Sequence, residues 1–88
     1  MVEQVVTIQN RLGLHARACT IFVKVAAKFA AHIYVERDGV EVNGKSILGV
    51  MMLAAEMGAQ IMLKADGPDE REALEALVAV VNDKFGEE

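Results

Sequence analysis

The sequence predicts an α+β fold in which helices cover one face of an antiparallel sheet. The segment from Gln60 to Asp66 alternates between apolar and polar side chains, which is typical of a strand with one buried face. Two longer segments each place apolar residues on a single helical stripe, as helices do when one side packs against a core. With 88 residues, of which 53% are hydrophobic, the chain is long enough for one compact domain spanning residues 1–88.

The first half of the chain is expected to form a strand, a helix and a hairpin. Val2 to Ile8 is rich in β-branched residues and suits a strand. Ala16 to Ala30 follows helical periodicity, and the polar stripe of this predicted helix holds Arg17, Thr20, Lys24 and Lys28. Its inward stripe is expected to hold Ala18, Phe22, Val25, Ala26 and Phe29. Ile33 to Arg37 and Val40 to Val42 flank Asp38-Gly39, a dipeptide that accepts the positive φ angles of a tight turn.

The second half is expected to add a short helix, the alternating strand and a final helix. Ser46 is a suitable N-cap for a helix from Ile47 to about Leu53. After the break at Gly67-Pro68, Asp69 and Glu72 have the spacing of a capping box. The side chains that the last helix is expected to bury are Leu74, Leu77, Val78, Val81 and Phe85.

Charge and composition exclude several classes of protein. A net charge of −4 and a pI near 5.1 argue against nucleic-acid binding, which requires a basic face. Charged residues interrupt every apolar run before it reaches the length of a membrane span, so no membrane insertion is expected. The start of the sequence shows no secretory signal, and the lone Cys19 cannot form an internal disulfide, which favours a cytoplasmic location. No metal or cofactor is expected.

His15 is the candidate nucleophile. It stands where a strand pattern ends and a helical one begins, close to the first free N–H groups of the helix, where the dipole favours an anion. Arg17 adds a fixed positive charge with a planar fork that suits phosphate oxygens. A nitrogen nucleophile beside an anion site suits phosphoryl transfer, although a histidine that merely caps a helix fits this short pattern equally well.

Two motifs resemble the HPr family, the histidine phosphocarriers of the phosphoenolpyruvate-dependent phosphotransferase system. The stretch from Asn10 to Arg17 is similar to the active-centre loop of that family, and Asn43 to Met51 is similar to its regulatory-serine segment. The likeness covers the whole chain, including Ala65-Asp66-Gly67 before the last helix. It implies an HPr-like open-faced β-sandwich, in which three helices cover one face of a four-stranded antiparallel sheet in the order βαββαβα.

The same resemblance implies the activity. Enzyme I would phosphorylate His15 at Nδ1, Arg17 would clamp the phosphate, and the group would pass to an enzyme IIA domain. The chain would be a monomeric, stoichiometric carrier rather than a turnover enzyme. Ser46 would be a regulatory phosphorylation site, with HPr kinase/phosphorylase as a further partner where the host encodes one. The residues expected to bind partners are Thr20, Lys24, Ile47, Leu48 and Met51.

One departure from the family pattern lies beside the site. Ala18 stands where the family usually has proline, which leaves the helix entry less rigid and adds one free backbone donor. The alternative function is a regulatory HPr-like binding protein of a nitrogen-related or catabolite-control branch, acting through Ser46 and the helix surface. The presence of both His15 and Arg17 favours the carrier, because a purely regulatory protein needs neither.

Two other motifs are misleading. Gly39 to Ser46 satisfies the letters of a nucleotide-binding P-loop, but the four residues between its glycines alternate like a strand and include Glu41, which would repel phosphate. Cys19 stands four residues from His15, yet it lies close to the apolar stripe and is expected to be an inert, buried thiol. The methionines at 51, 52, 57 and 62 lack the paired cysteines of a soft-metal site and are expected mostly in the core.

Overall fold

The computed structural model describes residues 1–87, which form four strands and three α-helices. The elements are β1 (Val2–Thr7), α1 (Ala16–Ala26), β2 (His32–Arg37), β3 (Val40–Asn43), α2 (Ile47–Met51), β4 (Gln60–Asp66) and α3 (Glu70–Asn82), followed by a 3-10 turn, η1 (Lys84–Gly86). The predicted α+β class and the order βαββαβα are therefore confirmed.

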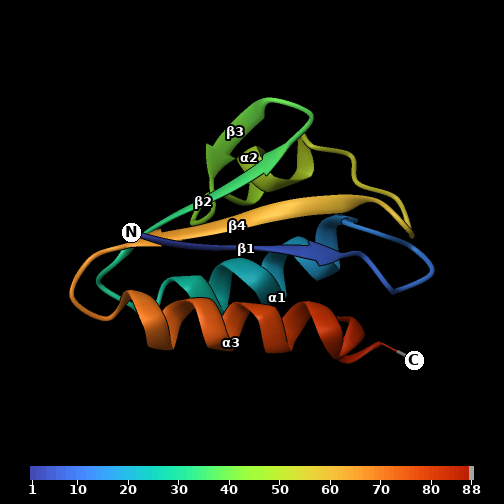
Figure 1. Ribbon diagram of the computed structural model, residues 1–88. Coiled ribbons are helices and arrows are strands. Elements are labelled where there is room, and N and C mark those ends of the chain that lie inside the picture. The colour runs from blue at the N-terminus through green and yellow to red at the C-terminus, as the bar shows by residue number, and fades with distance from the viewer. Residues whose placement is uncertain (88) are drawn as a thin grey trace.

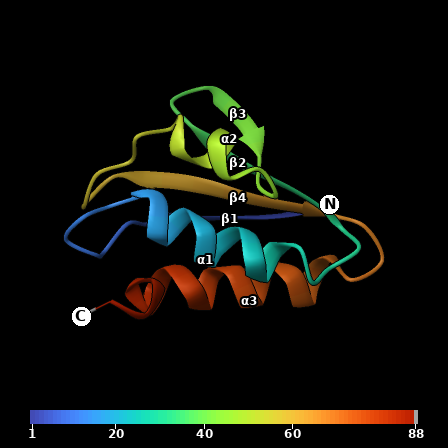
Figure 2. The same cartoon turned by 180° about the vertical axis from the view of Figure 1, so that it is seen from behind.

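The strands form one antiparallel sheet in the order β1-β4-β2-β3. In this register Val6 lies opposite Ile61, and Ile33 lies opposite Ala65. Helices α1 and α3 run side by side beneath the sheet, with α3 against β1 and β4, while α2 lies beside β3 and contacts α1 (Figures 1 and 2). The molecule is thus a two-layer sandwich.

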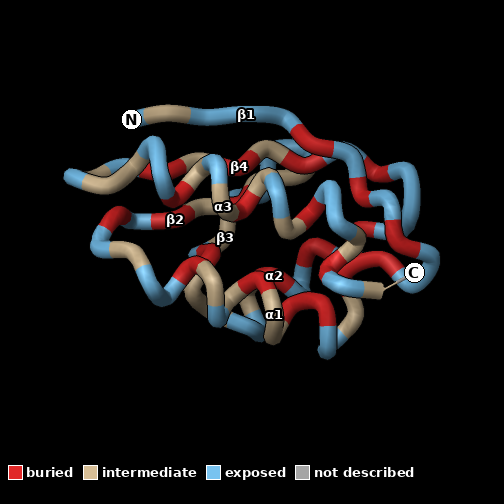
Figure 3. Tube along the Cα trace, turned by 90° about the horizontal axis from the view of Figure 1, so that it is seen from below, coloured by how far each residue is buried: buried red, intermediate tan, exposed pale blue. Residues whose placement is uncertain are grey.

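The core lies between the sheet and the helices. Inward positions of β4 are buried and outward ones are not, as the alternating pattern predicted. In Figure 3 buried residues recur along α3 between exposed and partly buried ones, about once per helical turn. The largest fully buried apolar side chains are Phe22, Phe85, Ile8, Ile33, Leu63, Leu77, Val35, Val50 and Val81.

The first helix is shorter than predicted. It ends at Ala26 rather than Ala30, and the next residues make tighter bonds, from Lys28 N to Val25 O and from Phe29 N to Ala26 O. The amides of Ala30 and Ala31 donate to a side chain from a distant segment and not to carbonyls of the helix. Each donates to the carboxylate of Asp69 at 2.8 Å. Asp69 therefore binds the backbone between the end of α1 and the start of β2, and the helix does not continue through these residues.

The same contact explains why the predicted capping box is wrong. Asp69 occupies the N-cap of α3, but its carboxylate serves Ala30 and Ala31 and makes no cap bond to α3. These hydrogen bonds, foremost the one from Ala30, hold the pKa of Asp69 below its ordinary value. Glu72 is exposed, and it is Glu70 that reaches back to accept from Gly67 N at 3.1 Å.

Other boundaries differ by a few residues. The two hairpin strands pair as predicted, each one residue longer than expected, and Asp38 and Gly39 both have positive φ (52° and 84°) in the turn between them. Ser46 caps α2, which ends at Met51 rather than near Leu53. The last helix also stops early: Phe85 is buried, but from η1, while Ala73 takes an unpredicted place in the core and Leu74 and Val78 are only partly buried.

Candidate functional site

His15 is the N-cap residue of α1. Its backbone is extended (φ −81°, ψ 176°), and its side chain makes no capping hydrogen bond. The first turn of the helix itself contains no acidic residue, and its free N–H groups and dipole favour an anion. With 27% of its side chain exposed, the imidazole lies at the surface beside a site that favours an anion.

A tight loop places His15 at this position. Gly13 adopts φ +67°, and a Cβ there would lie only 2.4 Å from the carbonyl oxygen of Ala55. That oxygen accepts the amide of Leu14 at 2.9 Å, while the amide of Gly13 donates to Asn10 O at 3.1 Å. Glycine is therefore required here both for its backbone angle and for the close approach of the two segments.

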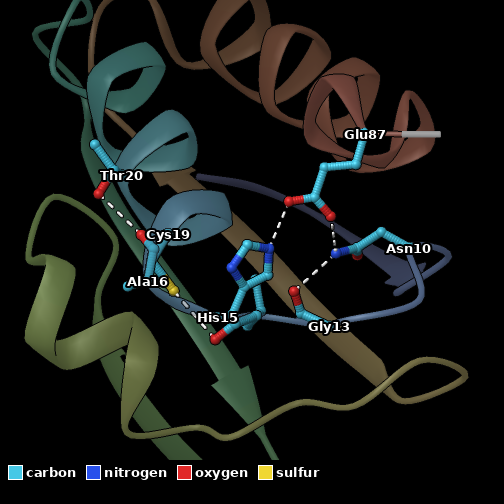
Figure 4. A network of polar contacts seen from close by, with 8 residues as sticks. Asn10, Gly13, His15, Ala16, Cys19, Thr20 and Glu87 are labelled. Atoms are coloured by element: carbon cyan, nitrogen blue, oxygen red, sulfur yellow. Dashed lines mark hydrogen bonds and ion pairs between the residues drawn. The ribbon is translucent and has the colours of Figure 1, made fainter.

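A carboxylate faces the imidazole from the far end of the chain. Glu87 Oε2 lies 2.5 Å from His15 Nε2, and Glu87 Oε1 accepts from Asn10 Nδ2 at 2.9 Å (Figure 4). Asn10 Nδ2 also donates to Gly13 O at 2.8 Å, so one buried amide connects the loop to the acid. The bond from Asn10, then those from His15 and the charge of Arg17, hold the pKa of Glu87 below its ordinary value.

A turn with two left-handed residues brings Glu87 to this place. Lys84 and Phe85 have φ of 57° and 55°, so the chain reverses after α3, and the Phe85 ring is anchored in the core. The sequence analysis missed Glu87 and Asn10. Glu87 lies 72 residues from His15, and nothing in the local sequence marks either residue as a partner of the histidine.

Arg17 lies on the exposed side of the first turn of α1, beside a surface cavity of about 510 Å³. Arg11 and Arg17 line this cavity with the apolar Leu12 and Ile21, and Glu87 closes one side. Two guanidinium groups near a helix N-terminus provide donors for phosphate oxygens. The structure thus brings His15 and Arg17 together with an acid and a second arginine that the sequence did not predict.

Ser46 and the predicted partner residues lie on and around α2. Ser46 Oγ accepts from Gly49 N at 3.0 Å, as an N-cap should. Ile47, Leu48 and Met51, which were expected to bind partners, are all exposed, Leu48 to 75%. On the neighbouring α1, Lys24 is exposed, whereas the Thr20 hydroxyl donates to Ala16 O at 2.9 Å.

Lys45 and the methionines complete the description of this surface. Lys45 does not add a free positive charge, because its Nζ donates to Phe29 O at 2.7 Å and the side chain is half-buried. The expectation that most of the methionines fill the core is wrong. Met51, Met52 and Met57 are exposed, Met52 to 77%, because α2 and the loop after it lie at the edge of the sandwich.

The competing motifs are explained by the fold. Cys19 is buried, its thiol donates to Leu14 O at 3.4 Å, and burial raises its pKa to about 11, so it remains a protonated, inert thiol. The central residues of the P-loop look-alike form β3. Among residues 1–87, no cluster of three metal-ligating side chains occurs, and no helix is long and apolar enough to cross a membrane.

A helix N-terminus that presents a histidine and an arginine defines a protein suited to carrying a phosphoryl group. The profile of the family described as "PTS HPr component phosphorylation site" matches residues 2–83. The phosphocarrier protein HPr of Cupriavidus necator is 47% identical over 87 residues, covering 99% of this chain and 98% of the relative. The HPr-like protein Crh of Bacillus subtilis is 44% identical over 84 residues, covering 96% and 99%.

Solved structures agree with the sequence comparison. The crystal structure of HPr-C-His from Thermoanaerobacter tengcongensis superimposes with a TM-score of 0.96 at 48% identity, covering 100% of this chain and 99% of the other. The chain therefore belongs to the HPr family, the phosphocarrier proteins of the phosphotransferase system. It is a component of that system and not a turnover enzyme.

Proposed function

We propose that His15 accepts a phosphoryl group from phosphorylated enzyme I and passes it to an enzyme IIA domain. The observation that carries this proposal is the placement of the His15 ring. It stands at the N-terminus of α1 with Nε2 bound to Glu87, and its other nitrogen lies on the side of the ring away from that acid (Figure 4). Membership of the HPr family supports the choice of enzyme I and enzyme IIA as partners.

Glu87 selects the attacking nitrogen. An ionised carboxylate can only accept hydrogen bonds, so the ring nitrogen that faces it, Nε2, must carry the hydrogen. In a neutral imidazole the lone pair then lies on Nδ1, which is the nucleophile that the family resemblance implies. During transfer a bond forms between Nδ1 and phosphorus while the bond from phosphorus to the donor atom breaks. Nε2 keeps its hydrogen, and Glu87 balances the positive charge that develops on the ring.

The phosphoryl oxygens would be bound by the elements on the open side of the ring. The free N–H groups of the first turn of α1 and the Arg17 guanidinium are suited to the charge that the group brings. Loss of one such charge-stabilising donor typically costs about 2–4 kcal/mol in the transition state. Arg17→Ala should accordingly slow transfer without abolishing it.

Labelling with phosphoenolpyruvate and enzyme I, followed by intact mass, tests the acceptor. The wild-type chain should gain one phosphoryl group that is stable in base and lost in acid, and His15→Ala should gain none. The matched control is His32→Ala, which removes the other histidine, an exposed residue of β2. Labelling of His15→Ala, or loss of labelling in His32→Ala, would contradict the assignment.

The exposed apolar residues of α2 are proposed as the docking face for both partners, with Thr20 and Lys24 of α1 beside them. Leu48 is 75% exposed, so Leu48→Glu should weaken binding to enzyme I with little change in melting temperature. Val5→Glu is the control, because Val5 is also exposed but lies on β1, at the opposite edge of the sheet from β3 and α2. Equal weakening by both variants would contradict a specific face.

Ser46 is proposed as a regulatory site on that face. A phosphate at the N-cap of α2 would be tolerated by the helix dipole, but it would bring a charge of about −1.5 to −2 to the docking surface. Ser46→Asp should therefore retain stability and slow phosphorylation of His15. An unchanged rate would reduce Ser46 to a helix cap. HPr kinase/phosphorylase is the partner expected to modify it.

A regulatory function is the second candidate, favoured by the 44% identity to the HPr-like protein Crh of Bacillus subtilis. The same labelling experiment separates the two, because a purely regulatory protein would bind its partners without accepting phosphate from enzyme I. We expect the carrier to be a monomer, which light scattering would test.

A further inference from the structure

We propose that Arg37 is a positioning residue for phosphoryl transfer, acting on His15 through the segment that follows α2. Arg37 continues the buried alternation of Ile33 and Val35 and therefore points toward the helix layer at the end of β2. Only 22% of its side chain is exposed. A charged group in such a place requires hydrogen-bond partners.

The Arg37 guanidinium finds these partners on the chain just beyond α2. Nη1 donates to Leu53 O at 3.1 Å and to Ala54 O at 2.9 Å, and Nη2 donates to Glu56 Oε1 at 2.7 Å. The planar fork thus holds two backbone carbonyls and one carboxylate at once, which a single ammonium group does less well.

The segment that Arg37 holds has an unfavourable backbone conformation. Residues 54–56 form neither helix nor strand, and Ala54 has φ +48°, a left-handed angle that side chains disfavour. The Arg37 contacts on both sides of this angle offset its cost. Without these hydrogen bonds, we expect the backbone around Ala54 to relax toward a more common conformation.

Relaxation there would reach the active-centre loop directly. Ala55 O accepts the amide of Leu14, the residue before His15, and it lies where a Cβ on residue 13 would be only 2.4 Å away. The position of Ala55 therefore fixes Gly13 and Leu14, and these fix the start of α1. Arg37 does not line the cavity beside Arg17 and Glu87, so its influence on the phosphate runs through this packing and not through its charge.

Three variants test the proposal: Arg37→Met, Arg37→Lys and the control Arg71→Met. The control removes the same charge from an exposed position on α3. Phosphoryl transfer from enzyme I is measured as a function of its concentration, at a temperature where thermal melting shows every variant to be folded. For Arg37→Met the maximal rate should fall about threefold to tenfold, because small displacements of a nucleophile are costly, while KM changes less than about twofold.

The second readout is the ¹H–¹⁵N resonance of Leu14 and the protection of its amide from exchange. Both should change in Arg37→Met, change less in Arg37→Lys, and stay constant in Arg71→Met. An unchanged maximal rate, a loss carried by KM alone, an unmoved Leu14 resonance or full wild-type behaviour of Arg37→Lys would each overturn the proposal. If Arg37→Met unfolds, Arg37→Lys still decides, since it keeps the charge and loses the fork.

The rate measurement rests on the proposed function of His15, but the Leu14 measurement does not. If His15→Ala were still labelled by enzyme I, the proposed function would fail while the coupling of Arg37 to Leu14 remained intact. If Arg37→Met left Leu14 unchanged while His15→Ala abolished labelling, the inference about Arg37 would fail alone.

Discussion

Replacing Gly13 by alanine should destabilise the fold and slow phosphoryl transfer together. The left-handed angle of Gly13, φ +67°, costs a residue with a Cβ about 1–2 kcal/mol. The new Cβ would also lie 2.4 Å from Ala55 O and 3.0 Å from Glu56 Cα, both backbone atoms that must move. Overpacking of this kind typically adds about 1–3 kcal/mol, so the total loss should be about 2–5 kcal/mol.

Gly39→Ala is the matched control for this prediction. Gly39 also has a positive φ, +84°, but a Cβ there would meet no atom within 4 Å. The two variants therefore share the backbone cost, and their difference of about 1–3 kcal/mol measures the contact with Ala55. Thermal melting should give a Tm at least about 4 °C lower for Gly13→Ala than for Gly39→Ala. Equal melting temperatures would refute the argument that the backbone of Ala55 and Glu56 cannot move away from a Cβ at position 13 without cost.

Other predictions concern Glu87, Cys19 and Ser46. The pKa of Glu87 is held below its ordinary value of 4.5, first by the hydrogen bond from Asn10. Ionised Glu87 therefore contributes fully to the free energy of unfolding above pH 4.5, and this contribution is lost as the pH falls through the lower pKa of the folded protein. Glu87→Gln should remove this part of the acid dependence in urea titrations run at a series of pH values. Because burial raises the pKa of Cys19 to about 11, iodoacetamide should label it in mild base only as fast as the protein opens, which intact mass would follow. Ser46→Ala should cost about 1 kcal/mol in urea unfolding by leaving Gly49 N without its cap, and Ser46→Asp, which keeps an acceptor there, should not.

Local patterns predicted the elements well and their ends less well. The hairpin turn at Asp38-Gly39 and the Ser46 cap depend on residues within a few positions of each other, and both are present. The end of α1 depends on Asp69, which accepts a hydrogen bond from the amide of Ala30 and lies 39 residues away from it in the sequence. No periodicity in residues 16–30 records that acceptor, so the helix was predicted to run too far.

The candidate site divides in the same way. The placement of His15 and Arg17 at the start of α1 was readable because a strand pattern meets a helical one there. Glu87 and Arg37 were not readable, because each acts through contacts with segments distant in sequence. A charged residue at a strand position that should point inward, as Arg37 does after Val35, was the one signal that sequence alone offered.

Asn10 shows how these distant parts form one site. It is fully buried, and among residues 1–87 its Oδ1 has no hydrogen-bond partner, which typically costs about 1–3 kcal/mol. Its Nδ2 donates both to Gly13 O and to Glu87 Oε1. An ionised aspartate has no hydrogen to donate to these two oxygens, and an apolar residue would leave both without a partner. It is therefore the donor of this amide, and not its acceptor, that the site uses. Through it, the loop that places His15 and the carboxylate that orients the His15 ring are bound to one another.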